Sequence, residues 1–492
     1  MVKRDVPGSW LPPGGVVPNL IGGAACLPAS GASFDKLDPA DGVLLWRAAA
    51  SGRDDVDAAV GAAATAQAAW AEVPGVRRGL ALHRLVVAME QHRDELAGIV
   101  AAETGKSLPD AQKETDGAIQ VGLFYAGEGQ RLFGRTTTST VPGRHAMTLR
   151  QPVGVAGLVV PANTPIANVA WKVFPALVCG NAAVLKSAED APATAWAFGR
   201  LATEAGLPKG VLAVVHGLGS EAGAALVAHP RVDVVSFTGS SAVGRQVQAV
   251  VTARMARVSL ELGGKNPFVV LADADLDHAV TWAALSAFSN AGQRCAAASR
   301  IIVAEAIHDV FVERLVARAA GLRVGTGIDA DLGPVINERQ MRRILGAVEG
   351  AVKRGARVLV GGHRLNAPPL DRGYFIAPTL LADVAPADPV SREELFGPVA
   401  CVYRVAGFEE ALALANDADY ALTACVHTRD VGRAFAFVSR VVAGVAVVNA
   451  GTYGSEPHMP FGGLRMSGNG MREPGPEALD VYTNLKTVYV HG

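Results

Sequence analysis

Residues 155–160, Val155-Ala156-Gly157-Leu158-Val159-Val160, form an apolar run of strand length that ends at Pro161. Four more such runs follow, at residues 183–186, 212–216, 234–238 and 258–262, and helical segments separate them. Strands that alternate with helices predict a parallel sheet, whose ligand site lies at the carboxyl ends of the strands. We therefore expect an α/β fold with its site at that edge.

Polar and small residues do collect where these runs end. They are Asn163, Lys186, Gly217, Gly219, Thr238, Gly239, Ser240 and Glu261. No Gly-x-Gly-x-x-Gly opens the first unit, so the pattern by itself is weak support for a dinucleotide. The turn at residues 237–240 before a helix fits either a phosphate held by helix amides or an ordinary N-cap serine.

The flanking segments outline the rest of the chain. Residues 1–45 predict an irregular leader with one short hairpin, and residues 54–106 have the apolar spacing of long helices. Residues 136–155 predict an extended hairpin, which is either a surface flap or a strand that pairs with another subunit. Residues 266–448 form a second α/β pattern, and residues 481–490 predict a closing strand. The expected core positions of the first helices are Val56, Val60, Ala64, Leu80, Leu82, Leu85, Val86 and Met89.

The composition restricts the class of protein. A chain of 492 residues exceeds the size at which one core keeps growing, so two or more lobes are expected. A formal net charge of −1 gives no electrostatic case for a nucleic-acid partner or an anionic membrane surface. The five cysteines are far apart and lack a Cys-x-x-Cys spacing, which predicts neither a disulfide framework nor a metal site and favours the cytoplasm. The N-terminus, with Lys3, Arg4 and Pro7, lacks the apolar core of a signal peptide, and the apolar runs are too short to span a membrane.

Ser289-Asn290-Ala291-Gly292-Gln293-Arg294-Cys295 places one cysteine after a polar turn and beside a cation. The thiolate is the nucleophilic form of cysteine, and a neighbouring positive charge lowers the thiol pKa. Cys295 is therefore a candidate nucleophile, with Arg294 expected to lower its pKa. The alternative is a small core residue, since many isolated cysteines are inert and buried.

Glu261-Leu262-Gly263-Gly264-Lys265-Asn266-Pro267 places a carboxylate at the end of an apolar run. The two glycines that follow allow close approach of backbone or ligand. A buried glutamate commonly pairs with a lysine. A base together with the thiol of Cys295 is also a catalytic pairing.

With these two motifs the chain resembles the NAD(P)-dependent aldehyde dehydrogenase superfamily, from Phe34 to the final strand. Residues 261–265 are similar to the family's glutamate motif, and residues 292–295 are similar to its cysteine motif. Further segments resemble other family signatures in the same order, at residues 161–165, 237–240, 394–398 and 460–463.

The resemblance implies a division of the chain. A Rossmann-like, parallel-sheet NAD-binding domain would comprise residues 1–135 and 156–262, and a second α/β catalytic domain residues 263–452, with residues 453–477 returning toward the cofactor domain. Residues 136–155 and 478–492 would form a small β oligomerisation arm. The resemblance also implies a homodimer or homotetramer that acts on a small-molecule aldehyde.

The catalytic roles carry over position by position. Cys295 would attack the aldehyde, and Glu261 would activate the water that hydrolyses the resulting thioester. The Asn163 amide and the backbone N–H of Cys295 would stabilise the oxyanion. Lys172 and Glu473 would pass a proton away from Glu261.

The ligand contacts carry over in the same way. NAD is the expected cofactor, and NADP is less favoured because its 2′-phosphate would face the negative charge of Glu189. Arg294, Trp171 and Phe461 would contact the substrate, and Arg294 either binds an anionic semialdehyde tail or serves only the thiol. No metal is expected. The expected cofactor-binding residues are Lys186, Glu189, Gly219, Thr238, Gly239, Ser240, Val243, Leu262, Gly263, Glu394 and Phe396.

The chain departs from the common family pattern at two places. Ala162 and Thr164 replace a Trp and a Phe beside Asn163, which leaves the pocket shape open, and Ser187 replaces a proline in a loop. Two rival functions stay open at this point. A CoA-acylating relative would not need Glu261, and a thiol esterase or structural protein on the same scaffold would not bind a nicotinamide.

Overall fold

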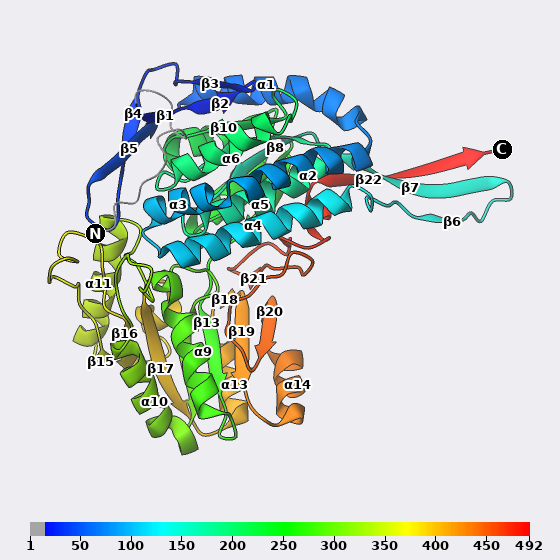
Figure 1. The fold of residues 1–492 in the computed structure, drawn as a ribbon. Helices are drawn as coiled ribbons and strands as arrows, with labels where there is room; N and C mark the ends of the chain where they lie inside the picture. Colours follow the sequence, from blue (N-terminus) through cyan, green and yellow to red (C-terminus); the bar gives the residue numbers. More distant parts are fainter. Residues whose placement is uncertain (1–14) are drawn as a thin grey trace.

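The computed structural model describes residues 15–492, so the expectations for Lys3, Arg4 and Pro7 lie outside the described residues. Its first sheet has seven strands in the order β12-β11-β8-β9-β10-β2-β3 (Figure 1). The five strands from β12 to β10 are parallel, and β2 and β3 add an antiparallel hairpin at one edge. The strands are β2 (Asn19–Ile21), β3 (Ala24–Cys26), β8 (Val155–Val159), β9 (Ala182–Lys186), β10 (Leu212–Val215), β11 (Val234–Thr238) and β12 (Arg257–Glu261). All five predicted runs are therefore strands of one sheet.

Helices cover both faces of this sheet because its strands are apolar on both sides. Alternate strand residues such as Val155 and Ala156 belong to different core clusters on opposite faces. One face packs against α2 (Gly75–Gln91), α3 (Arg93–Thr104), α4 (Leu108–Glu128), α5 (Pro165–Val178) and α6 (Pro192–Glu204). The other face packs against α1 (Arg53–Glu72), α7 (Ala224–Ala228) and α8 (Ser241–Thr252). A short π-helical turn, η1 (Gly219–Gly223), precedes α7.

The prediction of long helices over residues 54–106 is confirmed, and α3 ends at Gly105 with a left-handed φ of 76°. One core position was wrong. Leu80 is 49% exposed, whereas Leu82, Leu85 and Val86 are fully buried. Leu80 lies on the solvent side of α2, because the buried stripe of that helix runs through Arg78, Ala81 and Leu82 instead.

A three-stranded sheet flanks the first one near the N-terminus. It joins β1 (Val16–Val17), β5 (Leu44–Ala49) and β4 (Ser33–Leu37). The predicted irregular leader thus contains five short strands within residues 16–49.

The second lobe holds another seven-stranded sheet, in the order β15-β16-β17-β14-β13-β19-β20. Its strands are β13 (Asn266–Val270), β14 (Ala298–Ala304), β15 (Arg357–Val360), β16 (Thr379–Ala382), β17 (Val399–Val405), β19 (Thr423–His427) and β20 (Val445–Val448). One face packs against α9 (Leu276–Phe288) and α10 (Glu305–Ala320), and the other against α11 (Glu338–Lys353), α13 (Phe408–Asn416) and α14 (Val431–Arg440). The short helix α12 (Pro389–Arg392) leads into β17. The second predicted α/β pattern is confirmed.

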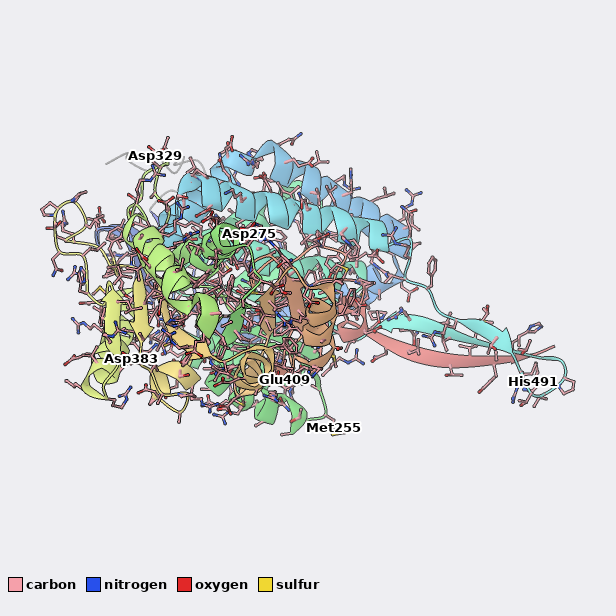
Figure 2. The ribbon with its side chains drawn as sticks, turned by 90° about the horizontal axis from the view of Figure 1, so that it is seen from below. Met255, Asp275, Asp329, Asp383, Glu409 and His491 are labelled. Atoms are coloured by element: carbon pink, nitrogen blue, oxygen red, sulfur yellow. The ribbon has the colours of Figure 1, made fainter. Side chains whose placement is uncertain are left out.

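A three-stranded arm projects from the body of the molecule (Figure 1). It consists of β6 (Thr136–Thr138), β7 (Arg144–Pro152) and β22 (Thr483–His491), with β7 in the middle. His491 lies at the far end of the arm (Figure 2). The closing strand begins at Thr483, two residues later than predicted, because Val481 ends the short helix α15 (Ala478–Val481). Residues 453–477, the return segment, contain β21 (Leu464–Arg465), which pairs with β18 (Tyr420–Ala421) in a two-stranded ribbon.

Candidate active site

Cys295 lies in the connection between α9 and β14, after the 3₁₀ turn η2 (Ser289–Gly292). Asn290, Ala291 and Gly292 all have left-handed φ angles, of 54°, 54° and 68°. A Cβ at Gly292 would lie 2.1 Å from the carbonyl oxygen of Gly397, so only glycine fits there. This tight turn reverses the chain after α9 and brings Cys295 against the glutamate motif.

The two sequence motifs contact each other directly. Asn266 Nδ2 donates to the carbonyl oxygen of Cys295 at 2.7 Å and to that of Ala297 at 2.9 Å. A Cβ at Gly264 would lie 2.4 Å from the Cys295 carbonyl oxygen. Gly264 and Asn266, both in the glutamate motif, therefore fix the backbone position of Cys295.

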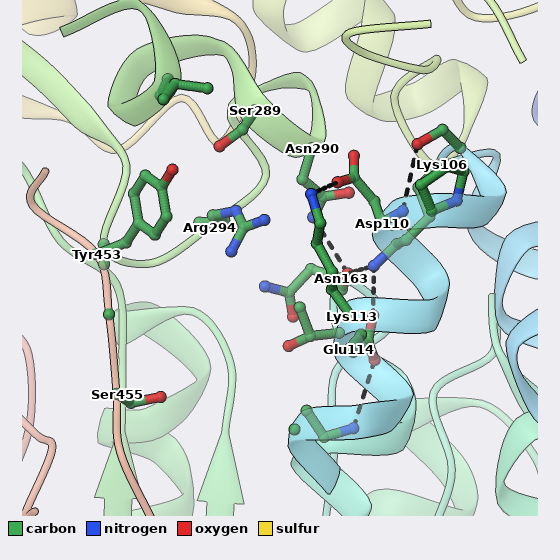
Figure 3. A pocket seen from close by; sticks show the side chains of 18 of the residues that line it. Lys106, Asp110, Lys113, Glu114, Asn163, Ser289, Asn290, Arg294, Tyr453 and Ser455 are labelled. Carbon is green, nitrogen blue, oxygen red and sulfur yellow. Dashed lines mark hydrogen bonds and ion pairs between the residues drawn. The ribbon is translucent and has the colours of Figure 1, made fainter. Parts of the chain in front are cut away.

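A cavity of about 690 Å³ opens onto Cys295. Its walls come from α4, α5, α9 and residues 453–461, and Figure 3 shows Arg294 between Tyr453 and the α4 residues Lys113 and Glu114. The Trp171 and Phe461 rings, which also line this cavity, pack edge to face with their centroids 5.6 Å apart. Five residues expected from the sequence share the lining, namely Cys295, Asn163, Arg294, Trp171 and Phe461.

Arg294 lowers the pKa of the Cys295 thiol, as expected, but the net pKa is raised and not lowered. Burial is the largest cause, the charges of Glu394 and Glu261 act in the same direction, and together they hold that pKa at about 12 against the Ala296 backbone hydrogen bond and Arg294. The sequence shows which cation follows the turn but not how deeply the sulfur is buried, and burial dominates. The thiol is therefore neutral in the resting site.

Asn163 is held at the cavity wall by several contacts. Its side-chain Nδ2 donates to the backbone carbonyl oxygen of Gln293 at 3.0 Å. The backbone carbonyl oxygen of Asn163 accepts from Lys106 Nζ at 2.8 Å and from Asn290 Nδ2 at 3.2 Å. Lys106 is itself buried and pairs with Glu114 at 2.5 Å. An amide nitrogen carries two hydrogens, so the Asn163 side chain retains a donor beside Cys295.

Glu261, the last residue of β12, has a buried carboxyl group in which neither oxygen makes a hydrogen bond. A Cβ at Gly462 would lie 2.7 Å from Glu261 Oε1, so the glycine makes room for this side chain. Burial and the charge of Glu473 raise the pKa of Glu261 well above its usual range, and Lys172 and Arg472 oppose that shift. Burial therefore favours the protonated form of this carboxyl group, which is close enough to Cys295 to influence its titration.

Lys172 and Glu473 form an ion pair in the interior. Lys172 Nζ lies 2.7 Å from Glu473 Oε2, and the two side chains are 1% and 0% exposed. Lys172 comes from α5, whereas Glu473 belongs to the return segment, far away in the sequence. The structure thus places the two expected relay residues together and next to Glu261.

The expected adenosine contacts meet at the carboxyl ends of β9 and β10. Lys186 Nζ lies 3.7 Å from Glu189 Oε1, and that oxygen accepts a hydrogen bond from the Gly219 amide at 2.5 Å. Burial lowers the pKa of Lys186, while Glu189 opposes that shift. The Glu189 side chain is 41% exposed, whereas that of Lys186 is 3% exposed.

Ser240 is the N-cap of α8, and its Oγ accepts from the Val243 amide at 3.4 Å. Thr238 ends β11, and Gly239 follows it in the same turn. A Cβ at Gly244 would lie 2.5 Å from a Leu262 methyl, so this glycine lets α8 approach the end of β12. The N-cap interpretation is confirmed, and phosphate binding by the amides of this helix start stays a prediction.

Glu394 reaches the glutamate motif from the second lobe. Its Oε1 accepts from the Gly264 amide at 3.0 Å, and a Cβ at Gly263 would lie 2.2 Å from its Oε2. Burial raises the pKa of Glu394 to about 7, against the pull of the Gly264 hydrogen bond and Lys265. Phe396, two residues on, has a left-handed φ of 55°.

Three contributors to this site were missed by sequence reasoning. Asn266 and Gln293 stand inside the two quoted motifs, where their fixed spacing was the available signal. Gln293 ties the cysteine turn to the second lobe, since its Oε1 accepts from the Ile336 amide at 2.8 Å. Tyr453, whose ring lies 4.9 Å from the Arg294 guanidinium carbon, sits in a segment without any distinctive pattern.

Within residues 15–492, no group of three or more His, Cys, Asp or Glu side chains is placed to hold a metal ion. None of the helices in that same range is both long and apolar enough to cross a membrane.

Comparison with known proteins places this site in context. The sequence profile described as the Aldehyde dehydrogenase family matches residues 27–488. The alpha-ketoglutaric semialdehyde dehydrogenase of Bacillus subtilis is 38% identical over 96% of this chain and 97% of its own length. The alpha-ketoglutarate semialdehyde dehydrogenase of Haloferax volcanii is 42% identical over 89% of this chain and 91% of its own. A crystal structure of betaine aldehyde dehydrogenase from Staphylococcus aureus in complex with NAD⁺ superposes with a TM-score of 0.94 at 31% identity, covering 96% of this chain and 95% of that one.

Proposed function

The chain belongs to the aldehyde dehydrogenase family, and from that premise we propose how its own residues carry out the reaction. The protein is an oxidoreductase that converts an aldehyde to the carboxylic acid with a nicotinamide cofactor. One observation supports the assignment of residues most strongly. Cys295 and Asn163 share the cavity, while the unpartnered carboxyl group of Glu261 lies buried beside them.

The first half of the proposed reaction takes place on Cys295. Its thiolate adds to the aldehyde carbon, and the negative charge that develops on oxygen is met by the Asn163 amide and the Cys295 backbone N–H. Donors that are already in place stabilise such charge without reorganising, and loss of one typically costs about 10²–10³ in rate. When bound, NAD accepts the hydride that leaves this carbon. Cys295 then carries the thioester.

The second half depends on Glu261. A carboxylate within reach of the thioester takes a proton from water, and the water oxygen then attacks the acyl carbon. Burial of an unpaired carboxyl group is costly, so its retention here favours a function over packing. A CoA-acylating enzyme would not need this group, and Glu261 therefore favours hydrolysis over that rival.

The residues of the first sheet fit a dinucleotide. The start of α8, capped by Ser240, offers free amides for the pyrophosphate, and Lys186 with Glu189 offers polar groups for the adenosine ribose. Glu394, over Gly263 and Gly264, would hold the nicotinamide ribose. We propose NAD in preference to NADP, because a 2′-phosphate would meet the charge of Glu189.

The substrate proposal is an aldehyde with a carboxylate tail. Arg294 lines the cavity, and its Nε is buried with no hydrogen-bond partner. Two relatives are named as dehydrogenases of alpha-ketoglutaric or alpha-ketoglutarate semialdehyde. We propose the same class of substrate, a semialdehyde, for this chain.

We also propose that the arm mediates a homodimer or homotetramer, and that the predicted domain boundaries apply. Strand β22 is the outer strand of the arm, so one row of its backbone groups faces away from β7. Leu485 and Tyr489 on this strand are 65% and 58% exposed. All five cysteines are free, which supports the proposed cytoplasmic location.

The test of the proposed mechanism is the variant Glu261→Gln. Incubation with NAD and an aldehyde should release about one equivalent of reduced nicotinamide per site and leave an acyl adduct on Cys295, detectable by mass spectrometry. Glu456→Gln, which alters an exposed carboxylate on the same cavity, is the control and should turn over normally. Steady turnover by Glu261→Gln at the wild-type rate, without an adduct, would refute the role of Glu261.

A further inference from the structure

Ser236 lies in the middle of β11 and joins both members of the buried ion pair. Lys172 Nζ donates to Ser236 Oγ at 2.6 Å, and Ser236 Oγ donates to Glu473 Oε1 at 2.6 Å. The Ser236 side chain is fully buried. A hydroxyl group has one hydrogen and two lone pairs, so it accepts from the ammonium group and donates to the carboxylate at the same time.

The contacts divide the two oxygens of Glu473 between different donors. Oε2 accepts from Lys172 at 2.7 Å, while Oε1 accepts from Ser236 at 2.6 Å. Two further hydroxyl groups, those of Ser259 and Tyr482, approach Oε1 only to 3.4 Å. Ser236 is therefore the short contact that sets the orientation of this carboxylate toward Lys172.

The pair is electrostatically coupled to Glu261, whose proton affinity Glu473 raises and Lys172 lowers. Each hydrolysis of the acyl-enzyme transfers a proton from water to Glu261, if the proposed function holds. Both oxygens of Glu261 are buried, so that proton needs an acceptor within the protein before the next turnover. The Lys172–Glu473 pair is the neighbouring group with that capacity.

We propose that Ser236 is a positioning residue for the proton transfer that restores Glu261 after each deacylation. In the hydrolysis, the water oxygen bonds to the acyl carbon, the carbon–sulfur bond breaks, and its electron pair returns to the Cys295 sulfur. The water proton goes to the Glu261 carboxylate. A water molecule then carries that proton to Lys172, which releases one of its own to Glu473, directly or through the Ser236 hydroxyl, and Glu473 loses its proton to solvent before the next turnover. This inference rests on the proposed role of Glu261.

The surroundings of the pair supply the other groups that titrate or carry charge. They are Glu261 at the end of β12, Arg472 beside Glu473, Tyr125 on α4, Tyr482 before β22, and the Cys179 thiol. The two tyrosines and the cysteine are neutral at ordinary pH because burial raises each pKa. Glu261 is therefore the group whose protonation the pH dependence of deacylation should follow.

The experiment compares Ser236→Ala with Ser259→Ala. Ser236 and Ser259 are direct neighbours on β11 and β12, both fully buried, and differ mainly in their distance to Glu473. Positioned proton transfer contributes about 10²–10⁴-fold to a reaction, and we expect Ser236→Ala to slow deacylation about tenfold at pH 6. The deficit should shrink toward pH 9, where solvent base removes the Glu261 proton more readily. The first-turnover burst of reduced nicotinamide should keep its wild-type rate.

Ser236→Thr, which keeps the hydroxyl group, should restore deacylation, and Ser259→Ala should match the wild type. The proposal is overturned if Ser236→Ala deacylates normally from pH 6 to 9, or if Ser259→Ala shows the same deficit. It is also overturned if the threonine variant folds and yet deacylates no faster than the alanine variant. Glu261→Gln in parallel separates the two ideas: a trapped acyl-enzyme there, with a normal Ser236→Ala, refutes only the role of Ser236.

Discussion

Replacing Arg294 by alanine tests the proposed substrate class. The Nε of this guanidinium is buried without a partner, and its carbon lies 4.9 Å from the Tyr453 ring at the cavity wall. A hydrogen bond to a charged group contributes about 1.5–3 kcal/mol, which corresponds to roughly ten- to 150-fold in kcat/KM. We expect that loss for a semialdehyde with a carboxylate tail. A neutral aldehyde of equal length should lose about twofold or less, because it offers Arg294 no carboxylate and burial, not Arg294, is the main influence on the thiol pKa.

The assay follows reduced nicotinamide with both aldehydes, for the wild type and three variants. Arg294→Lys keeps the charge but not the planar fork, and should recover part of the loss. Arg318→Ala removes an exposed cation from the same cavity and controls for long-range attraction of anions. If Arg294→Ala slows both aldehydes by the same factor, Arg294 serves the thiol or the fold, and the proposed anionic tail is wrong.

Three more outcomes follow from the structure. Since burial raises the pKa of Cys295 to about 12, the thiolate is the minor form below that pH. The rate of alkylation of the resting enzyme by iodoacetamide should therefore rise about tenfold per pH unit from 7 to 9. A plateau of that rate below pH 8 would contradict the raised thiol pKa. Glu189→Gln should reduce the preference for NAD over NADP in kcat/KM by about fivefold, the value of one nearby charge pair in water-like surroundings. Equal kcat/KM for the two cofactors in the wild type would refute the proposed preference. The double variant Leu485→Glu, Tyr489→Glu should shift the sedimentation of the protein toward a monomer. Glutamates at Val310 and Val352, exposed apolar residues elsewhere, should leave the sedimentation unchanged. A monomeric wild type at micromolar concentration would refute oligomerisation through the arm.

The main fold could be predicted because its strands are buried on both faces. Such strands are nearly continuous apolar runs, and the five runs between residues 155 and 262 all form parallel strands. Helix boundaries and faces are less determined, as Leu80 shows, because a one-position shift of an amphipathic stripe leaves the sequence pattern almost the same. The start of β22 was misplaced for a similar reason, since Val481 suits either a strand or the end of a short helix.

The site could be predicted where one short segment holds the relevant groups together. Cys295 and Glu261 are in such segments, and Asn266 contacts the cysteine from within its motif. Ser236 is different, because Glu473 lies 237 positions away and nothing in the local sequence indicates that contact. The sequence also failed to predict that the net pKa of the Cys295 thiol is raised, for a related reason. Its dominant cause is burial by distant segments, whereas the sequence shows only the adjacent cation.

Burial also explains why the relay matters to the chemistry as a whole. It is the largest cause of the raised pKa at Cys295, Glu261 and Glu394, so burial favours the protonated forms of the thiol and of Glu261 in the resting site. A neutral thiol is a poor nucleophile, and a protonated carboxyl group is not a base. Each therefore must lose a proton before it acts, in the acylation and deacylation halves respectively. In our proposal, the route through Lys172, Ser236 and Glu473 carries the proton of Glu261 away from the site, so that Glu261 can act as a base again in the next turnover.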